Sequence, residues 1–193
     1  MIITYNKDAV FNMKKLLITL GFIASTATFI GCQSMSTSTN NFIITPVHAV
    51  NAEGVGQYIG EVKFSDSKQG LIIETNLSKL PAGPHGFHIH QNPSCEPDVK
   101  DGVAGAALKA GAHYDPKQSG FHAAPTADGH LGDLPLLQVD NQGLAQVKLL
   151  APRLNLENIK GRAVMIHAGS DNYSDQPQAL GGGGARIACG VIE

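Results

Sequence analysis

Short runs of strand-forming residues, separated by glycine, proline and aspartate, recur between residues 42 and 192. Runs of this kind are typical of β-strands bounded by turns. In several of them the side chains alternate, so that Tyr58, Val62 and Phe64 share one face of an extended segment. Helical periodicity is weak and confined to residues 154–159. The sequence therefore predicts an all-β protein.

The runs predict eight strands and two long connections. Eight short antiparallel strands form a sandwich or a flattened barrel. The connections 91–133 and 168–185 are too long for turns, and loops of such length usually carry function. A loop without its own core can be held by a disulfide and a metal. The expected strands are 42–44, 56–64, 71–77, 86–90, 134–139, 143–150, 163–168 and 186–192.

The composition excludes several classes of protein. With 42% hydrophobic and 16% charged residues, the chain fits neither a disordered segment nor a coiled coil. A net charge of −2 without a basic run argues against nucleic-acid binding. The 22 glycines and few aromatic residues favour short strands and tight turns. The eight histidines are the strongest indication of chemistry.

The first residues have the pattern of a targeting segment. Met13-Lys14-Lys15 precede an apolar run, 16–30, that suits a signal-peptide core and is short for a bilayer span. The run leads to Gly31-Cys32, which resembles the lipobox of bacterial lipoproteins. We expect a signal peptide over 1–32, a tether over 33–41 and one domain over 42–193.

Both readings of this segment place the domain in the periplasm. Lipidation of Cys32, followed by Gln33, indicates an anchor in the outer membrane, which would be the chain's sole contact with a membrane. A secreted protein cleaved nearby is the alternative, and the sequence leaves both open. Cys95 and Cys189 would then be the remaining pair in an oxidising compartment and are expected to form a disulfide.

The spacing of the histidines indicates two metal sites. In 87–90 (FHIH) the strand period of two places His88 and His90 on one face, and His167 ends another expected strand in the same orientation. Imidazole-rich sites of low coordination suit copper. Three further imidazoles and a carboxylate suit a closed tetrahedral zinc site. These are His113, His122, His130 and Asp133.

Four segments are similar to motifs of the copper/zinc superoxide dismutases, in that family's order and most closely in its bacterial periplasmic branch. They are 86–90 (GFHIH), 111–114 (GAHY), 128–134 (DGHLGDL) and 184–192 (GARIACGVI). The resemblance extends from about residue 42 to residue 193. It implies an eight-stranded antiparallel Greek-key barrel of immunoglobulin-like architecture with two long functional loops.

The resemblance implies one copper and one zinc ion per subunit. It implies dismutation of superoxide to dioxygen and hydrogen peroxide by copper that changes oxidation state, beside a structural zinc, and so protection of the cell envelope. The implied copper ligands are His88, His90, His113 and His167. The implied zinc ligands are His113, His122, His130 and Asp133, so that His113 is shared.

Three further positions match the family. Arg186 corresponds to its active-site arginine, which attracts and orients a small anion. Asp171 corresponds to an aspartate that hydrogen-bonds one ligand of each metal, with Asp175 as a competing candidate. The glycine run 181–184 departs from the animal-type pattern of charged and hydroxyl residues, so steering charges are expected elsewhere, at Lys100 or Lys109.

Other functions remain open at this point. The fold could carry a copper-buffering protein without turnover, although the shared histidine and the arginine are both present. A cupin also uses His-x-His on a barrel strand, but its later Glu and His in a Pro-x-Gly context are missing. An adhesive domain with structural zinc would leave His88, His90 and His167 without a use. The chain is expected to be a monomer or a homodimer.

Overall fold

A computed structural model describes residues 41–193. The expected signal peptide, Cys32 and the tether up to residue 40 lie outside the described residues. Within 41–193 no helix has the length and apolar character needed to cross a membrane.

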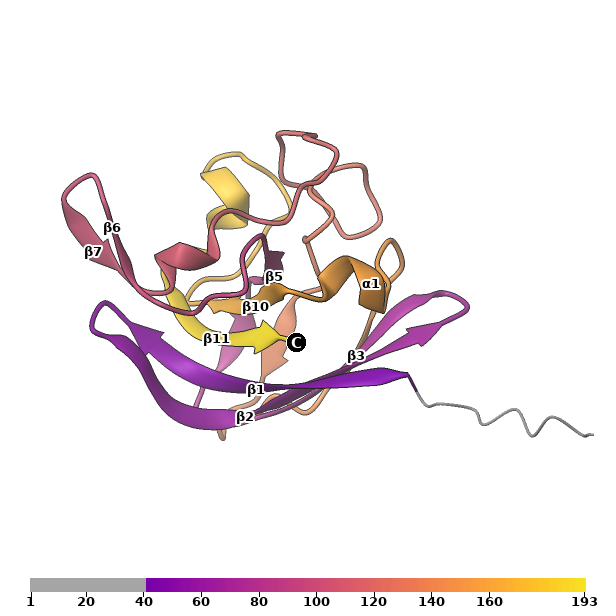
Figure 1. Cartoon of the computed structure of the whole chain (residues 1–193), viewed down its shortest axis with the longest axis horizontal. Coiled ribbons are helices and arrows are strands. Elements are labelled where there is room, and N and C mark those ends of the chain that lie inside the picture. Colours follow the sequence, from indigo (N-terminus) through magenta and orange to yellow (C-terminus); the bar gives the residue numbers. More distant parts are fainter. Residues whose placement is uncertain (1–40) are drawn as a thin grey trace, which may run out of the picture. The chain divides into compact units, whose positions relative to one another are not determined.

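Seven strands form one antiparallel sheet that curls on itself (Figure 1). Their order across the sheet is β5-β10-β11-β1-β2-β3-β9. A separate antiparallel pair is formed by β4 (Gly83–His85) and β8 (Leu137–Val139). In the sequence, β4 comes just before β5 and β8 just before β9. The all-β prediction is confirmed. The strands of the large sheet are β1 (Phe42–Asn51), β2 (Gly54–Ser67), β3 (Gly70–Leu77), β5 (Phe87–His90), β9 (Lys148–Ala151), β10 (Arg162–His167) and β11 (Arg186–Ile192).

The inward side chains of the strands form the main core. Phe64 of β2, Phe87 of β5 and Ile166 of β10 are buried in one hydrophobic cluster. The short helix α1 (Leu156–Ile159) adds its two terminal residues to the same cluster and is capped by Asn155. On β5 the core residues alternate with His88 and His90, and on β10 His167 lies on the face opposite the core residues Val164 and Ile166, so that burial of one face fixes the direction of the other.

Several strand bounds differ from the prediction. β1 continues to Asn51, whose side chain accepts hydrogen bonds from the backbone of the turn into β2. The strand expected at 143–150 begins only at Lys148, although Ala145 already pairs with Leu77 of β3 as an isolated bridge. The connection 91–133 also carries a hairpin, β6 (Asp98–Lys100) with β7 (Val103–Gly105), and the short 3₁₀ helix η1 (Leu108–Ala110).

A disulfide joins the long connection to the sheet. Cys95 in the connection and Cys189 in β11 are bonded, with their Cα atoms 5.7 Å apart. Both cysteines belong to a second, smaller cluster of buried residues on the side of the sheet away from the main core. The start of the connection is thereby fixed to the strand that carries Arg186.

Candidate metal centre

The long connection returns twice to the free edge of β5. The backbone N–H of Tyr114 donates to the carbonyl of Ile89, and the N–H of Ile89 donates to the carbonyl of Gly132, both at 2.8 Å. A Cβ atom at Gly132 would collide with that Ile89 oxygen, so the close approach requires glycine. These contacts place His113 opposite His90 and Asp133 opposite His88.

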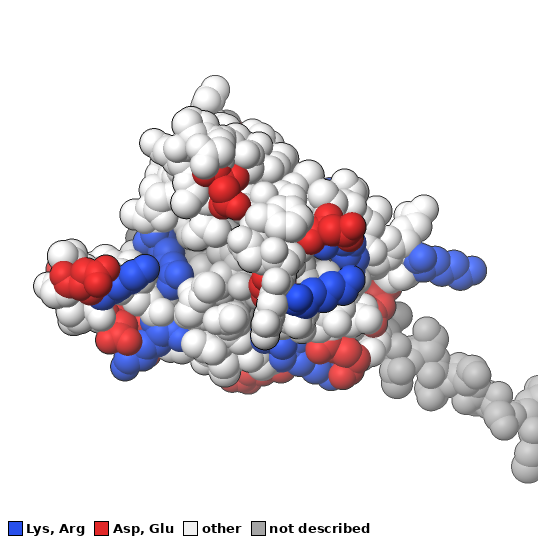
Figure 2. All heavy atoms as spheres, turned by 90° about the horizontal axis from the view of Figure 1, so that it is seen from above, with Lys and Arg blue, Asp and Glu red and all other residues white. Residues whose placement is uncertain are grey.

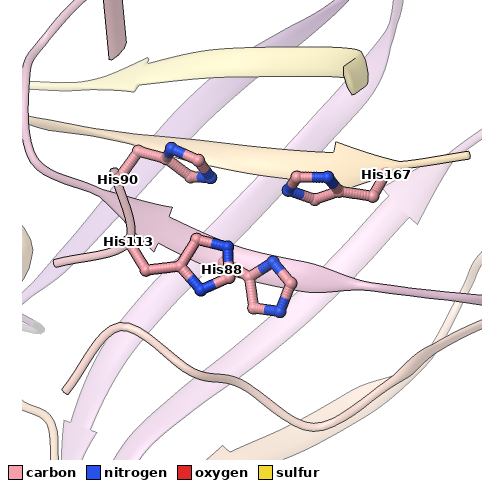
Figure 3. Close-up of side chains that lie close together, drawn as sticks. All are labelled: His88, His90, His113 and His167. Carbon is pink, nitrogen blue, oxygen red and sulfur yellow. The ribbon is translucent and has the colours of Figure 1, made fainter. Parts of the chain in front are cut away.

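Four imidazoles turn toward one another beside β5 and β10 (Figure 3). We call them the four-histidine group, and candidate ligand atoms of its members all lie within 4.8 Å of one another. Each ring has one buried nitrogen without a hydrogen-bond partner, which proteins rarely tolerate unless an ion or water takes that place. These nitrogens are His88 Nδ1, His90 Nε2, His113 Nε2 and His167 Nε2.

The second nitrogen of three of these rings fixes the orientation of the ring. His90 Nδ1 lies 2.9 Å from the carbonyl oxygen of Gly111, and His167 Nδ1 lies 3.1 Å from that of Gly184. His88 Nε2 lies 2.8 Å from Asp171 Oδ2. Metal-binding histidines in proteins are oriented by this kind of contact.

A carboxylate gathers the other three residues of the predicted zinc set. Asp133 Oδ1 lies 3.0 Å from Nδ1 of His113, 3.0 Å from Nδ1 of His122 and 3.5 Å from Nδ1 of His130. We call these four residues the Asp133 group. By mutual distance alone, His88 rather than His130 joins His113, His122 and Asp133. The structure thus places His130 near the other three residues, but farther from Asp133 Oδ1 than His113 and His122.

His113 belongs to both groups. Its Nδ1 is directed to Asp133, and its Nε2 is unpaired among the other three histidines. The ring stacks on that of His88 with centroids 3.9 Å apart. One imidazole therefore faces two candidate metal positions.

Asp171 joins the two groups from the connection 168–185. Its Oδ2 accepts from His88 Nε2, and its Oδ1 lies 2.7 Å from His122 Nε2. Asp175 instead accepts from the backbone N–H groups of His122 and Leu180 and contacts no ring in the described structure. At Gly181, which has φ +70°, a Cβ would collide with the Asp171 carboxylate, so the glycine run gives this loop its close approach.

Burial and charge set opposite pKa shifts within the site. Desolvation holds the pKa of His88 and of His90 well below the ordinary value and lowers that of His167 to about 4. For His122, burial also acts to lower the pKa, but hydrogen bonds to Asp133 and Asp171 raise it to about 9. The rings of the four-histidine group are therefore neutral near pH 7 and available as ligands.

Arg186 lies beside the four-histidine group. It is opposite His167 in the pairing of β11 with β10, and its guanidinium donates to the carbonyls of Ala107 and Gly111, both at 2.6 Å. The Gly111 oxygen is also the partner of His90. The arginine and one imidazole are thus held by the same backbone atom, and burial lowers the pKa of the guanidinium.

The face above the two long connections carries charges of both signs among many uncharged side chains (Figure 2). Lys100 in β6 and Lys109 in η1 are exposed.

The remaining histidine beside β5, His85, is buried and hydrogen-bonded to the carbonyls of His167 and Pro81. The backbone carbonyls of Gly111 and Gly184 were not foreseen from the sequence, because any residue type supplies a carbonyl.

A family model, related sequences and solved structures all match this chain, and all of them belong to one family. The family model described as copper/zinc superoxide dismutase matches residues 58–192. A superoxide dismutase [Cu-Zn] 2 of Salmonella typhimurium is 53% identical over 148 residues, covering 76% of this chain and 86% of the relative. A superoxide dismutase [Cu-Zn] of Brucella abortus is 46% identical over 173 residues, covering 89% and 98%.

Two solved structures are similar to the described fold. The Cu/Zn superoxide dismutase from Brucella abortus has a TM-score of 0.78 at 47% identity and covers 79% of this chain and all of its own. The monomeric copper, zinc enzyme from Salmonella enterica has a TM-score of 0.72 at 51% identity, with coverage of 79% and 100%. This chain belongs to the copper/zinc superoxide dismutase family, whose cofactors are copper and zinc.

Proposed function

We propose that the four-histidine group is the copper site and the Asp133 group the zinc site of an enzyme that dismutates superoxide to dioxygen and hydrogen peroxide. The observation that carries this proposal is the position of His113, which presents one nitrogen to each group. A ring can bind two ions only when both of its nitrogens are free of protons. Burial lowers the pKa of His113 and so favours loss of the first proton, and two bound cations would favour loss of the second.

The donor atoms fit these metals. Four imidazole nitrogens suit copper, and three imidazoles with one carboxylate suit tetrahedral zinc. The choice of His130 over His88 for zinc rests on unpaired atoms. His88 has a single unpaired nitrogen, which the four-histidine group uses, whereas His130 has a buried Nδ1 that otherwise lacks a partner.

Different residues of the chain have different roles in the reaction. When bound, copper supplies one-electron redox chemistry, and zinc, which does not change oxidation state, supplies charge and structure. His113 Nε2 is the atom we assign to taking up one proton and delivering it to the reduced superoxide, and water supplies the second proton needed for hydrogen peroxide. Arg186 attracts and orients the superoxide anion, and its two carbonyl contacts hold it in place. Asp171 fixes one ring of each site.

Metal content measured together with activity tests the proposal. The purified domain, loaded with both metals, should contain copper and zinc near one each per chain and should remove superoxide. A protein that binds both metals without turnover would instead be the copper-buffering alternative. A protein that keeps zinc alone after copper loading would contradict the four-histidine copper site.

We also propose that residues 1–32 are a signal peptide, that 33–41 form a tether and that the domain 42–193 works in the periplasm. The lipobox-like end of the apolar run supports lipidation of Cys32 and an outer-membrane anchor. The monomeric Salmonella enterica relative supports a monomer over a homodimer. Mass spectrometry of the mature N-terminus should find a lipid-modified Cys32, and an unmodified terminus at another residue would contradict the anchor.

A further inference from the structure

Arg153 makes an unusual set of hydrogen bonds to the connection that carries His130. Its Nε donates to the carbonyl of Pro125 at 2.9 Å, its Nη1 to that of Gly129 at 3.1 Å and its Nη2 to that of His130 at 2.5 Å. Arginine has five N–H groups in a fixed planar arrangement. All three of its nitrogens therefore hold one short segment, whose last residue is the proposed zinc ligand His130.

The backbone at Arg153 is fixed to the barrel. Ala151, two residues earlier, ends β9 and pairs with Leu71 of β3. Leu154 is 3% exposed and packs in the main core, and its N–H donates to the carbonyl of Ala151. Because the backbone is fixed on both sides of Arg153, its side chain extends from a rigid position.

The segment 124–130 depends on this arginine for its hydrogen bonds to the barrel. In the described part of the chain, its other hydrogen bonds stay within the same loop, as between Ala127 and Ala124 and between His130 and Phe121. The contact of His130 with Asp133 is also the longest in the Asp133 group, at 3.5 Å. Without a fixed backbone, His130 would be the member of the group that is easiest to displace.

We propose that Arg153 is a positioning residue for zinc, which holds the backbone of His130 so that its Nδ1 stays directed to Asp133. The proposal rests on the proposed function, because it takes His130 as a zinc ligand. Arg153 itself binds neither metal. Arg153 holds the backbone of His130 in position before zinc binds, so that binding costs less conformational entropy.

The test uses the purified mature chain with its disulfide intact and with the metals removed. The zinc dissociation constant is measured by competition with a chelator, with Zn²⁺ as the added ion, for wild type, Arg153→Gln and Arg153→Lys. Lys160→Gln is the matched control, since it removes the same charge from an exposed position at the other end of α1. His130→Ala reports whether His130 is a ligand.

Arg153→Gln should weaken zinc binding about tenfold or more, as loss of an orienting partner does in other metal sites. Arg153→Lys, which keeps the charge but has one nitrogen, should recover part of this loss, and Lys160→Gln should match wild type. Backbone amides of 124–131 should exchange hydrogen faster in metal-free Arg153→Gln. If that variant does not fold, Arg153→Lys carries the test, with a smaller expected loss.

Two results would overturn the inference in different ways. A wild-type zinc constant in Arg153→Gln, with or without a lower free energy of unfolding, would show that the arginine only stabilises the loop. This conclusion holds when His130→Ala does weaken zinc. If His130→Ala also leaves zinc binding unchanged, the proposed ligand set is wrong, and the role of Arg153 fails with it.

Discussion

Replacement of Asp171 by asparagine tests how the two metal sites are coupled. The carboxylate accepts hydrogen bonds from His88 and His122 at 2.8 and 2.7 Å, and its side chain is buried. The variant Asp171→Asn keeps the shape of the side chain but offers one carbonyl oxygen and one NH₂ group in place of two carboxylate oxygens. The oxygen can serve one ring, and the NH₂ group must then face the N–H of the other.

The size of the effect follows from these two bonds and from a third, which Oδ1 accepts from the backbone N–H of Tyr173 at 2.7 Å. A hydrogen bond to a charged group contributes about 1.5–3 kcal/mol, whereas a neutral one contributes about 0.5–1.5 kcal/mol. Asp171→Asn, with its oxygen at the Oδ1 position, removes the charged bond to His88 and converts the bonds to His122 and Tyr173 to neutral ones. The metal-loaded protein should therefore lose about 3.5–6 kcal/mol of unfolding free energy. Part of this loss should appear as metal binding that is roughly 10–100-fold weaker.

Urea unfolding of the loaded protein and chelator competition for each metal measure these two quantities. Asp140→Asn is the control, since Asp140 is exposed, accepts from the backbone N–H groups of Gln142 and Leu144 in its own turn and contacts neither metal group. It should cost less stability and leave both metal affinities near wild type. If Asp171→Asn and Asp140→Asn retained the same affinity for both metals, Asp171 would not orient the ligands.

Three other changes give distinct outcomes. His113→Ala should weaken both metals and His122→Ala mainly zinc, because one ring faces both groups and the other only one; separate metal titrations check this. Arg186→Ala should lower the second-order rate with superoxide and its salt dependence while copper is retained, since the arginine holds no metal. The metal-free protein should lose stability as pH falls below about 6.5, because the pKa of His167 is about 4 when folded and the unfolded chain binds more protons.

Each of these three predictions has a result that would contradict it. Equal and independent losses in His113→Ala and His122→Ala would argue against a shared ring. An unchanged rate in Arg186→Ala would place the arginine outside the path of the anion. For the acid effect, the pKa difference at His167 corresponds to about 3 kcal/mol at pH 4. Urea unfolding that is flat between pH 7 and about pH 4.5 would contradict it.

The approximate positions of most strands along the chain, and the faces on which their histidines lie, could be predicted from residue patterns. The FHIH motif specified which side chains of β5 face the core and which face the site, because the strand period of two leaves no other choice. The same reasoning placed His167 at the end of β10. Local periodicity suffices there, because regular backbone fixes side-chain direction.

Features of the loops could not be predicted in this way. The hairpin of β6 and β7 lies in a stretch treated as irregular, since its strands have three residues each and show no alternation. The contacts of Arg153 join residues more than twenty positions apart through backbone carbonyls, which leave no mark on residue type. Gly181 stood out as part of a glycine run, but its reason is the nearby carboxylate of Asp171.

The most direct measurement is diffraction from the metal-loaded protein at the copper and zinc absorption edges. We predict a copper peak within bonding distance of His113 Nε2 and the other three histidines, and a zinc peak within bonding distance of His113 Nδ1, His122, His130 and Asp133. Peaks that do not share His113, or a single metal position in place of two, would contradict the account.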